Sequence, residues 1–175
     1  MLKRALLIAV ILLLCFSPRL PGQDIGTEEN IKAVLIYNFT KFLHWPDDVL
    51  GDRFKVGVIG NHDIAAALKV ISAKKSIKNL PALIEETSSL NGITKYNLIY
   101  LSGESGINVS SIVNAVKDKP ILVIGDNEGW CEKGVSINLI KRDGKIKFEI
   151  NLSVLKETGI ESNSRFIKLA DQLYE

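Results

Sequence analysis

Short apolar runs, separated by polar segments, recur through the middle of the chain. Residues 63–71 and 107–116 have patterns typical of helices and lie between some of these runs. Because strand, glycine, helix and strand follow one another as in right-handed βαβ crossovers, this region predicts a mostly parallel sheet with helices on its faces. The four runs, each short enough for a buried strand, are FKVGVIG (54–60), PALIEE (81–86), YNLIYLS (96–102) and PILVIGD (120–126).

The pattern changes to alternation after Gly134. Apolar and polar residues alternate over 135–139 and again over 146–150, with Asp143-Gly144 between the two runs. The pair Asp-Gly tolerates the positive φ angles that a tight I′ turn requires, so this segment predicts an antiparallel β-hairpin.

The C-terminal tail is predicted to be helical. Gly159 is the expected stop of a first helix, and Ser162 or Ser164 is the expected cap of a last helix that runs through Leu173. The expected fold class is therefore α/β: a single domain with a mostly parallel central sheet, flanking helices and a C-terminal antiparallel β-hairpin followed by helix.

The first residues have the pattern of a secretory signal peptide. Lys3 and Arg4 precede the apolar run Ala5–Phe16, and helix-breaking and small residues follow it. The run is shorter than the roughly 20 residues that a membrane-spanning helix needs, so a retained membrane anchor is the weaker interpretation. We expect a cleaved signal peptide over residues 1–22 and one domain over 23–175.

Composition and charge place the remaining chain among ordinary globular domains. The full sequence has 175 residues, of which 46% are hydrophobic and 24% charged. Three of its 22 basic residues and none of its 20 acidic residues lie in residues 1–22, so 19 basic against 20 acidic residues leave a net charge of −1 after cleavage. No net electrostatic attraction to nucleic acid remains, and nucleic acid is not expected as a partner.

The sequence contains two cysteines. Lipid attachment at Cys15 is less favoured than a plain secreted form, because Leu14 precedes it where a small residue is needed. Cys131 is then the only cysteine of the mature domain and has no intramolecular disulfide partner. Burial, a free thiol and pairing between chains all remain open for it.

Few residues suit catalysis or metal binding. The only histidines are His44 and His62. His62 lies in an Asn-His-Asp segment, and helix capping explains the composition of this segment without a metal. Ser105 lies in Gly-Glu-Ser-Gly, which lacks the Gly-x-Ser-x-Gly spacing of a nucleophile elbow. A strand-to-helix loop with an exposed serine cap explains it better, so no catalytic residue and no metal site are predicted.

The loop at residues 125–130 follows an apolar strand, where open α/β sheets bind ligands. It has no GxGxxG or P-loop spacing, so it does not specify nucleotide phosphates. Asn127, Glu128 and Trp130 either contact a ligand or partner, or form a turn whose tryptophan closes the core. Location alone does not choose between these interpretations.

Aromatic residues gather in the segment IKAVLIYNFTKFLHWP, residues 31–46. Thr27 is the expected cap of a helix here, and Pro46 its expected end. The apolar arc is wider than a surface helix needs, so the helix is either enclosed by the core on most of its circumference or packed against both a core and a partner. On a helical wheel one broad side carries Ile31, Val34, Leu35, Asn38, Phe39, Phe42, Leu43 and Trp45, and the other carries Ala33, Tyr37, Thr40, Lys41 and His44.

Polar residues of this helix are candidates for specific contacts. An unpaired amide at Asn38, on the apolar side, would cost roughly 1 to 3 kcal/mol, so we expect a hydrogen bond, most simply to backbone. Tyr37 and Lys41 lie four residues apart with His44 nearby. These three residues form either a polar recognition patch or a solvated face.

Four sequence features occur in a fixed order along the chain. The signal peptide is followed by KAxLIYNFTKFxxWP, and GVSINLIKRDGKIKFEINL and RFIKLA come near the end. Together they resemble the YfiR-like family of bacterial periplasmic proteins, from about Thr27 to the C-terminus. The most distinctive elements are Tyr37-Asn38-Phe39, Trp45-Pro46, Gly144 and Glu149-Ile150-Asn151.

The resemblance implies a non-enzymatic periplasmic regulator without a cofactor. The best-known type in this family binds the periplasmic sensor part of an inner-membrane diguanylate cyclase and represses it, which lowers cyclic di-GMP and biofilm formation. Other members work with membrane histidine kinases, and family members can form homodimers. The family's disulfide near the loop before the closing hairpin has only Cys131 as a candidate here, so this sequence departs from the family pattern at that bridge.

The first functional hypothesis is a regulator that binds an inner-membrane diguanylate cyclase or sensor kinase. The alternative is a small-ligand binding or sensory module that works with a histidine kinase or receptor and uses the loops after Gly60, Ser102 and Gly125. A hydrolase based on Ser105 or His62 is the third. Under the first hypothesis, the helix over 28–45 and the loop over 127–130 contribute the partner or dimer surface through Tyr37, Asn38, Lys41, His44, Trp45, Asn127, Glu128 and Trp130.

Overall fold

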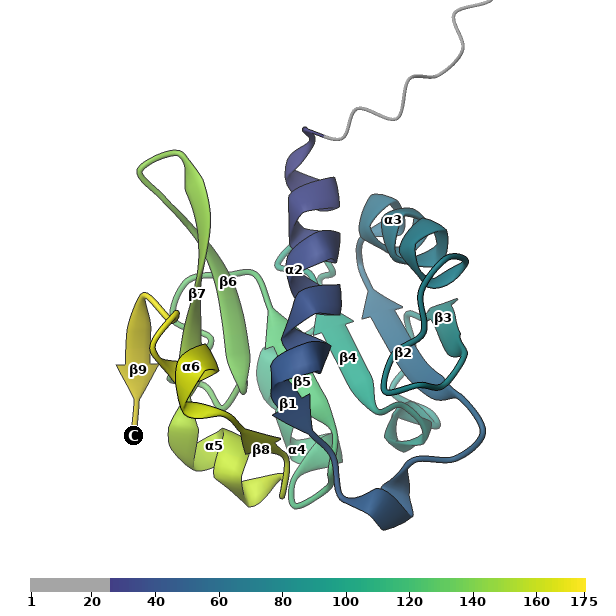
Figure 1. Ribbon diagram of the computed structural model, residues 1–175. Coiled ribbons are helices and arrows are strands. Elements are labelled where there is room, and N and C mark those ends of the chain that lie inside the picture. The colour runs from purple at the N-terminus through teal and green to yellow at the C-terminus, as the bar shows by residue number, and fades with distance from the viewer. Residues whose placement is uncertain (1–25) are drawn as a thin grey trace, which may run out of the picture.

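A seven-stranded sheet forms the centre of the molecule, with strand order β3-β2-β4-β5-β6-β7-β9 (Figure 1). The structure is a computed structural model that describes residues 26–175, so the expected signal peptide and Cys15 lie outside the described residues. The pairs from β3 to β6 are all parallel, β6 and β7 are antiparallel, and β7 and β9 are parallel. The strands are β2 (Phe54–Ile59), β3 (Ala82–Glu86), β4 (Leu98–Leu101), β5 (Leu122–Gly125), β6 (Ile137–Arg142), β7 (Lys145–Asn151) and β9 (Gln172–Tyr174).

Helices cover both faces of the sheet and create two apolar cores. The larger core lies between the sheet and α2, α3, α5 and α6, and the smaller one lies between the sheet and α4. The α/β fold class expected from the sequence is confirmed, including its mostly parallel sheet. The helices are α2 (Glu28–Phe42), α3 (His62–Ser72), α4 (Val109–Val116), α5 (Leu152–Glu157) and α6 (Ser164–Ile167), with short 3-10 helices η1 (Asp47–Val49) and η2 (Ile93–Lys95).

The β6–β7 hairpin turns at the predicted residues. Asp143 and Gly144 have φ angles of 52° and 72°, the positive values that a two-residue I′ turn needs. Arg142 pairs with Lys145 across the turn, and the register continues to Ile137 opposite Ile150. The local Asp-Gly signal is therefore sufficient to place this hairpin.

Side-chain caps begin the helices, mostly from asparagine. Thr27 caps α2 as predicted, because its Oγ1 accepts a hydrogen bond from the amide of Asn30. The prediction of a serine cap was wrong at two places: Asn108 rather than Ser105 caps α4, and Asn163 rather than Ser162 or Ser164 caps α6. Asparagine and serine are similarly good caps, so composition alone does not choose between neighbours.

The predicted last helix through Leu173 was wrong. The helix α6 ends at Ile167, and Gln172–Tyr174 instead extends the sheet as β9 beside β7. Asp171 directs this change, because its amide donates to the Phe148 carbonyl at 2.8 Å and its carboxylate pairs with Lys147 at 2.8 Å. These partners come from β7, so no local pattern in the tail reveals them.

The helix α2 is rotated relative to the helical-wheel prediction. Its buried residues are Ala33, Ile36, Phe39 and Thr40, whereas Ile31 and Val34 on the predicted apolar side are 43% and 47% exposed. The wide apolar arc allowed more than one choice of buried face. The buried Thr40 hydroxyl is satisfied within the helix, because it donates to the Tyr37 carbonyl at 2.7 Å.

The end of α2 also lies earlier than predicted. The helix stops at Phe42, and Leu43–His44 form the two-residue strand β1, which pairs with β8 (Glu161–Ser162). Leu43 is fully buried and has an extended conformation. The chain therefore leaves the helix three residues before Pro46 rather than at it.

The rotation of α2 gives a stability prediction. Replacing Phe39 by Ala removes a ring that lies 4.8 Å and 5.3 Å from the rings of Phe148 and Phe166, so we expect a loss of about 3 to 5 kcal/mol of unfolding free energy. The matched change Ile31→Ala, on the exposed side, should cost no more than about 0.5 kcal/mol. Urea unfolding of the two variants measures both values, and equal losses would contradict this orientation of α2.

Candidate functional site

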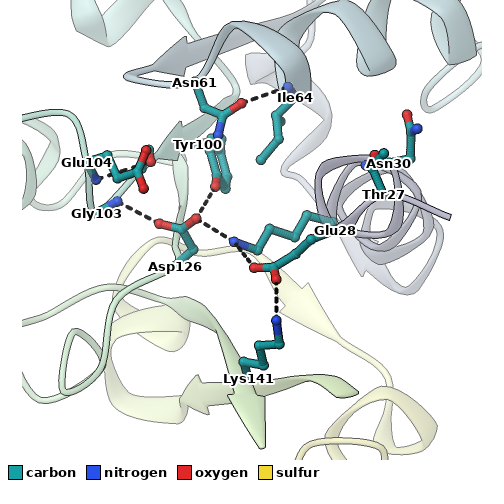
Figure 2. A network of polar contacts seen from close by, with 12 residues as sticks. Thr27, Glu28, Asn30, Asn61, Ile64, Tyr100, Gly103, Glu104, Asp126 and Lys141 are labelled. Carbon is teal, nitrogen blue, oxygen red and sulfur yellow. Dashed lines mark hydrogen bonds and ion pairs between the residues drawn. The ribbon is translucent and has the colours of Figure 1, made fainter. Parts of the chain in front are cut away.

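A buried carboxylate lies at the carboxyl end of β5 and joins three separate segments. Asp126 accepts hydrogen bonds from the Tyr100 hydroxyl on β4, from the Gly103 amide at 2.6 Å, and from the Lys32 ammonium on α2 at 2.8 Å (Figure 2). Its side chain is only 7% exposed. Sequence analysis missed this centre, because Lys32 and Asp126 are 94 residues apart and each is unremarkable in its own segment.

The network continues from Lys32 toward the hairpin. Lys32 pairs with Glu28 at 3.0 Å, and Glu28 pairs with Lys141 on β6 at 2.9 Å (Figure 2). Burial alone would lower the pKa of Lys32, but hydrogen bonds to Asp126 and Glu28 outweigh this and raise it. Hydrogen bonds from Lys141 and Lys32 lower the pKa of Glu28, so Lys32 and Glu28 are both charged at neutral pH.

Tyr100 serves the network as a neutral hydrogen-bond donor. Burial is the main cause that raises its pKa, and the adjacent charge of Asp126 raises it further. The phenol therefore keeps its proton under physiological conditions. Its role is to hold the Asp126 carboxylate in place and not to act as an acid or base.

This network occupies the edge at which α/β sheets usually bind ligands. The chain moves from β2 to β3 on one side and from β4 to β5 on the other, so β2 and β4 flank the topological switch point. A Cβ added at Gly60, after β2, would lie 2.4 Å from the Ser105 Cβ, so the loop after β4 packs directly on it. The loops after β2, β4 and β5 are thus held together by the protein's own groups.

Tyr37, Asn38 and Lys41 come together near the C-terminal end of α2. The Lys41 ammonium lies 4.7 Å from the centre of the Tyr37 ring and donates a hydrogen bond to Asn38 Oδ1 at 2.8 Å. The predicted backbone partner of Asn38 was wrong, because the amide is half-buried and its partner is a side chain. The Tyr37 hydroxyl donates to the Ser76 carbonyl at 3.4 Å, which ties this group to the segment after α3.

His44 and Trp45 have different surroundings from this group. His44 is exposed and lies in β1 opposite Glu161. Trp45 is 5% exposed, packs edge-to-face on Phe54, and donates from Nε1 to the Asn97 carbonyl at 3.2 Å. Trp45 therefore presents little surface to a partner.

The loop after β5 also separates into exposed and buried parts. Asn127 and Glu128 are exposed, whereas Trp130 is 6% exposed and belongs to the core beneath α4. A Cβ added at Gly125 would lie 2.5 Å from the Trp130 ring, so the glycine allows the ring to pack on the strand. Trp130 therefore closes the core, whereas a contact of Asn127 and Glu128 with a ligand or partner stays a prediction.

A groove between α2 and α3 has a volume of about 400 Å³. Tyr37 lies one helical turn beyond Val34, which is the last α2 residue of its lining. The two helices lie side by side (Figure 1). Val34 from α2 and Val70 from α3 line it and are 47% and 41% exposed, which is unusual for valine. The lining residues are Thr27, Glu29, Asn30, Val34, Asp63, Ala66, Ala67, Val70 and Ile71.

The remaining candidates for chemistry have structural explanations. His62 is exposed, and its Nδ1 lies 2.9 Å from Glu86 Oε2. Ser105 Oγ accepts a hydrogen bond from the Ile107 amide at 3.2 Å. Within residues 26–175, no group of three or more His, Cys, Asp or Glu side chains is arranged to hold a metal ion.

Cys131 is a buried free thiol. Burial, and next the negative charge of Glu149, raise its pKa to about 12. The thiol is therefore protonated at neutral pH. Of the three states that the sequence left open, Cys131 combines two, because it is both buried and free.

Comparison with known proteins identifies a family and a fold. A family model described as YfiR/HmsC-like matches residues 29–171. Members of this family are regulatory, non-catalytic periplasmic proteins of cyclic di-GMP signalling that generally interact with an inner-membrane signalling protein. None of the helices described in residues 26–175 has both the length and the apolarity needed to cross a bilayer.

Two solved structures resemble the chain in fold. One is a conserved domain protein from Vibrio cholerae, with a TM-score of 0.57, 14% identity and 84% of this chain covered. The other is an ABC domain in complex with L-Trp from Streptococcus pneumoniae, with a TM-score of 0.54, 14% identity and 81% of this chain covered. The match spans 60% and 58% of those two chains, and at this identity the likeness shows the fold alone.

The Asp126 network gives a second stability prediction. Asp126→Asn removes the charge that faces the largely buried ammonium of Lys32, so we expect unfolding free energy to fall by about 3 kcal/mol. Lys141→Ala, which removes the more exposed ion pair to Glu28, should change it by less than about 0.5 kcal/mol. Chemical denaturation compares the two variants, and a neutral effect of Asp126→Asn would show that the network does not hold α2.

The state of Cys131 gives a third prediction. In a Cys15→Ser chain, where Cys131 is the only thiol, iodoacetamide at pH 8 should leave the folded protein unmodified, because the buried thiol has its pKa raised to about 12. The same chain in concentrated urea should react fully. Mass spectrometry follows the adduct, and rapid labelling of the folded protein would contradict the buried state.

Proposed function

The chain belongs to the YfiR/HmsC-like family, and from this premise we propose that it is a periplasmic regulator that binds and represses the sensor part of an inner-membrane signalling protein. A diguanylate cyclase is the proposed partner, so that binding lowers cyclic di-GMP and limits biofilm formation. A sensor kinase is the second partner class within the same proposal. The proposed route to the periplasm is a signal peptide at residues 1–22.

The exposed apolar side of α2 is the observation that supports a binding role. Ile31 and Val34 lie in a helix whose opposite side is buried in the core, and Val70 of the neighbouring α3 extends the same surface. Adjacent exposed apolar side chains of this size favour an interaction site. Tyr37, Asn38 and Lys41 border this surface and are proposed to contribute polar contacts.

The physical mechanism of repression is a shift between two states of the partner. A regulator that binds an inactive sensor more tightly than an active one favours the inactive state by the difference between the two binding free energies. A preference of about 1.4 kcal/mol shifts the equilibrium about tenfold. The regulator needs no catalytic group for this task, which agrees with the non-catalytic character of the family.

The small-ligand alternative has weaker support from the described residues. Its expected site is formed by the loops after Gly60, Ser102 and Gly125. At this place the Asp126 carboxylate already accepts hydrogen bonds from the Lys32 ammonium and the Gly103 amide. A ligand at this edge would have to displace a largely buried ion pair. Binding of a partner to the exposed side of α2 requires no such displacement.

A fourth prediction tests the regulatory role. Deleting the gene should raise cellular cyclic di-GMP, and wild-type protein should restore the low level. Val34→Glu, which places a charge in the middle of the exposed apolar surface, should fail to restore it and should not capture a cyclase or kinase from solubilised inner membranes.

Leu90→Glu is the matched control, because Leu90 is also exposed, at 37%, but lies outside α2 and α3. This variant should behave as wild type in both assays. Equal activity of Val34→Glu and wild type would remove α2 from the proposal, and an unchanged cyclic di-GMP level after deletion would contradict the regulatory role itself.

A further inference from the structure

The groove between α2 and α3 has acidic residues at one end and apolar residues along its length, and basic residues lie just beyond its other end. At one end, Glu29 and Asp63 line the groove within the first turns of their helices. In the middle, Val34 and Val70 are exposed. Beyond the other end, Tyr37 lies one helical turn after Val34, and the ammonium groups of Lys41 and Lys75 lie 4.7 Å and 5.7 Å from the centre of its ring.

The charged groups at both ends lack opposite charges of their own. Within residues 26–175, no ion pair involves Glu29, Asp63, Lys41 or Lys75, although ten ion pairs occur elsewhere in this part of the chain. Each helix end contributes about half a charge of the opposite sign, which offsets only part of each pair. One end therefore remains acidic and the other basic.

We propose that this groove receives an amphipathic helix of the signalling partner, held in one orientation by the two charged ends. This inference rests on the proposed regulatory function and adds the chemistry of the recognised segment to it. The partner helix carries Lys or Arg where it meets Glu29 and Asp63, apolar residues over Val34 and Val70, and Asp or Glu where it meets Lys41 and Lys75.

A helix fits this surface better than an extended strand does. A cleft between two side-by-side helices accepts the ridge of a third helix, whereas strand addition needs an open sheet edge. The edge strands of the seven-stranded sheet are β3 and β9, the two-stranded sheet consists of β1 and β8, and none of these strands lines the α2–α3 groove. The groove therefore recognises the side chains that the partner helix places at helical spacing, and it forms no backbone hydrogen bonds with the partner.

The separation between the acidic residues and the basic residues sets the spacing in the partner. Glu29 and Lys41 are separated by twelve positions on α2, about 18 Å along the helix at ~1.5 Å per residue. A partner helix that spans this distance has its basic and acidic residues about three turns, or roughly 11 residues, apart on one face. Apolar residues at intermediate i+4 and i+7 positions fill the middle.

Synthetic helical peptides of 16 residues test the charge pattern directly. The peptides share leucines at the two middle positions and differ only at their end charges, which are Lys and Glu, Lys and Lys, or Glu and Glu, about 11 residues apart. Fluorescence anisotropy with the mature protein should show the Lys–Glu peptide binding about threefold more tightly than either like-charged peptide, and 0.5 M salt should abolish this preference.

Charge-reversed proteins supply the matched controls. The pair Glu29→Lys and Asp63→Lys should make the Glu–Glu peptide the preferred one, and the pair Lys41→Glu and Lys75→Glu should make the Lys–Lys peptide preferred. Circular dichroism confirms that both variants are folded. Absence of binding by the Lys–Glu peptide, or identical ranking of the peptides by all three proteins, would overturn the inference.

The membrane-capture assay separates this inference from the proposed function. Loss of cyclase or kinase capture in Val34→Glu, together with full capture in both charge-reversed proteins, would overturn the oriented helix while the regulatory role stands. A dimer in sedimentation that Val34→Glu dissociates would assign the groove to a second copy of this chain and would also overturn it. Loss of capture in both charge-reversed proteins, with peptide preferences exchanged as stated, supports it.

Discussion

The ion pair between Lys32 and Asp126 is the contact on which the placement of α2 depends. This helix precedes the sheet and is not part of a βαβ crossover, so chain connectivity does not fix its direction. Its N-terminal half contributes only Ala33 to the fully buried core. An ammonium that is 13% exposed needs a carboxylate nearby, and Asp126 is itself held by Tyr100 and Gly103. The carboxyl end of the sheet thereby determines where α2 begins to cross it.

This placement gives α2 two apolar sides with different uses. One side packs Phe39 against Phe148 and Phe166 in the larger core. The other side leaves Val34 next to Val70 of α3, with charged residues at both ends of the groove between them. A protein that regulates by binding needs a rigid surface more than it needs a reactive group, because only differential affinity moves the partner's equilibrium. The same helix therefore provides both the interior packing and the proposed binding surface.

Polar contacts also determine how the sheet ends. Glu149 on β7 is 2% exposed and accepts hydrogen bonds from Asn138 at 3.3 Å and Arg142 at 3.1 Å. Arg142 also pairs with Asp171, just before β9. These contacts attach the C-terminal strand to the hairpin and cover the edge of β7, which would otherwise expose unpaired backbone groups. Residues Gln172–Tyr174 form a strand because β7 provides backbone hydrogen-bond partners for them, although the sequence of the tail favours a helix.

The sequence by itself determined the features that depend on neighbours in the chain. Apolar runs located β2, β3, β4 and β5, Asp143-Gly144 located the hairpin through its positive φ angles, and Thr27 located the start of α2. Tertiary structure decided which side of α2 is buried, because its apolar arc was wide enough for several rotations. Packing of Phe39 against Phe148 and Phe166, together with the Lys32–Asp126 ion pair, selects one of them. It also decided that Trp45 and Trp130 are core residues and that Lys32 meets Asp126. Contacts between residues so distant in the chain carry no periodic signal, since each depends on the shape that all the other elements have already formed.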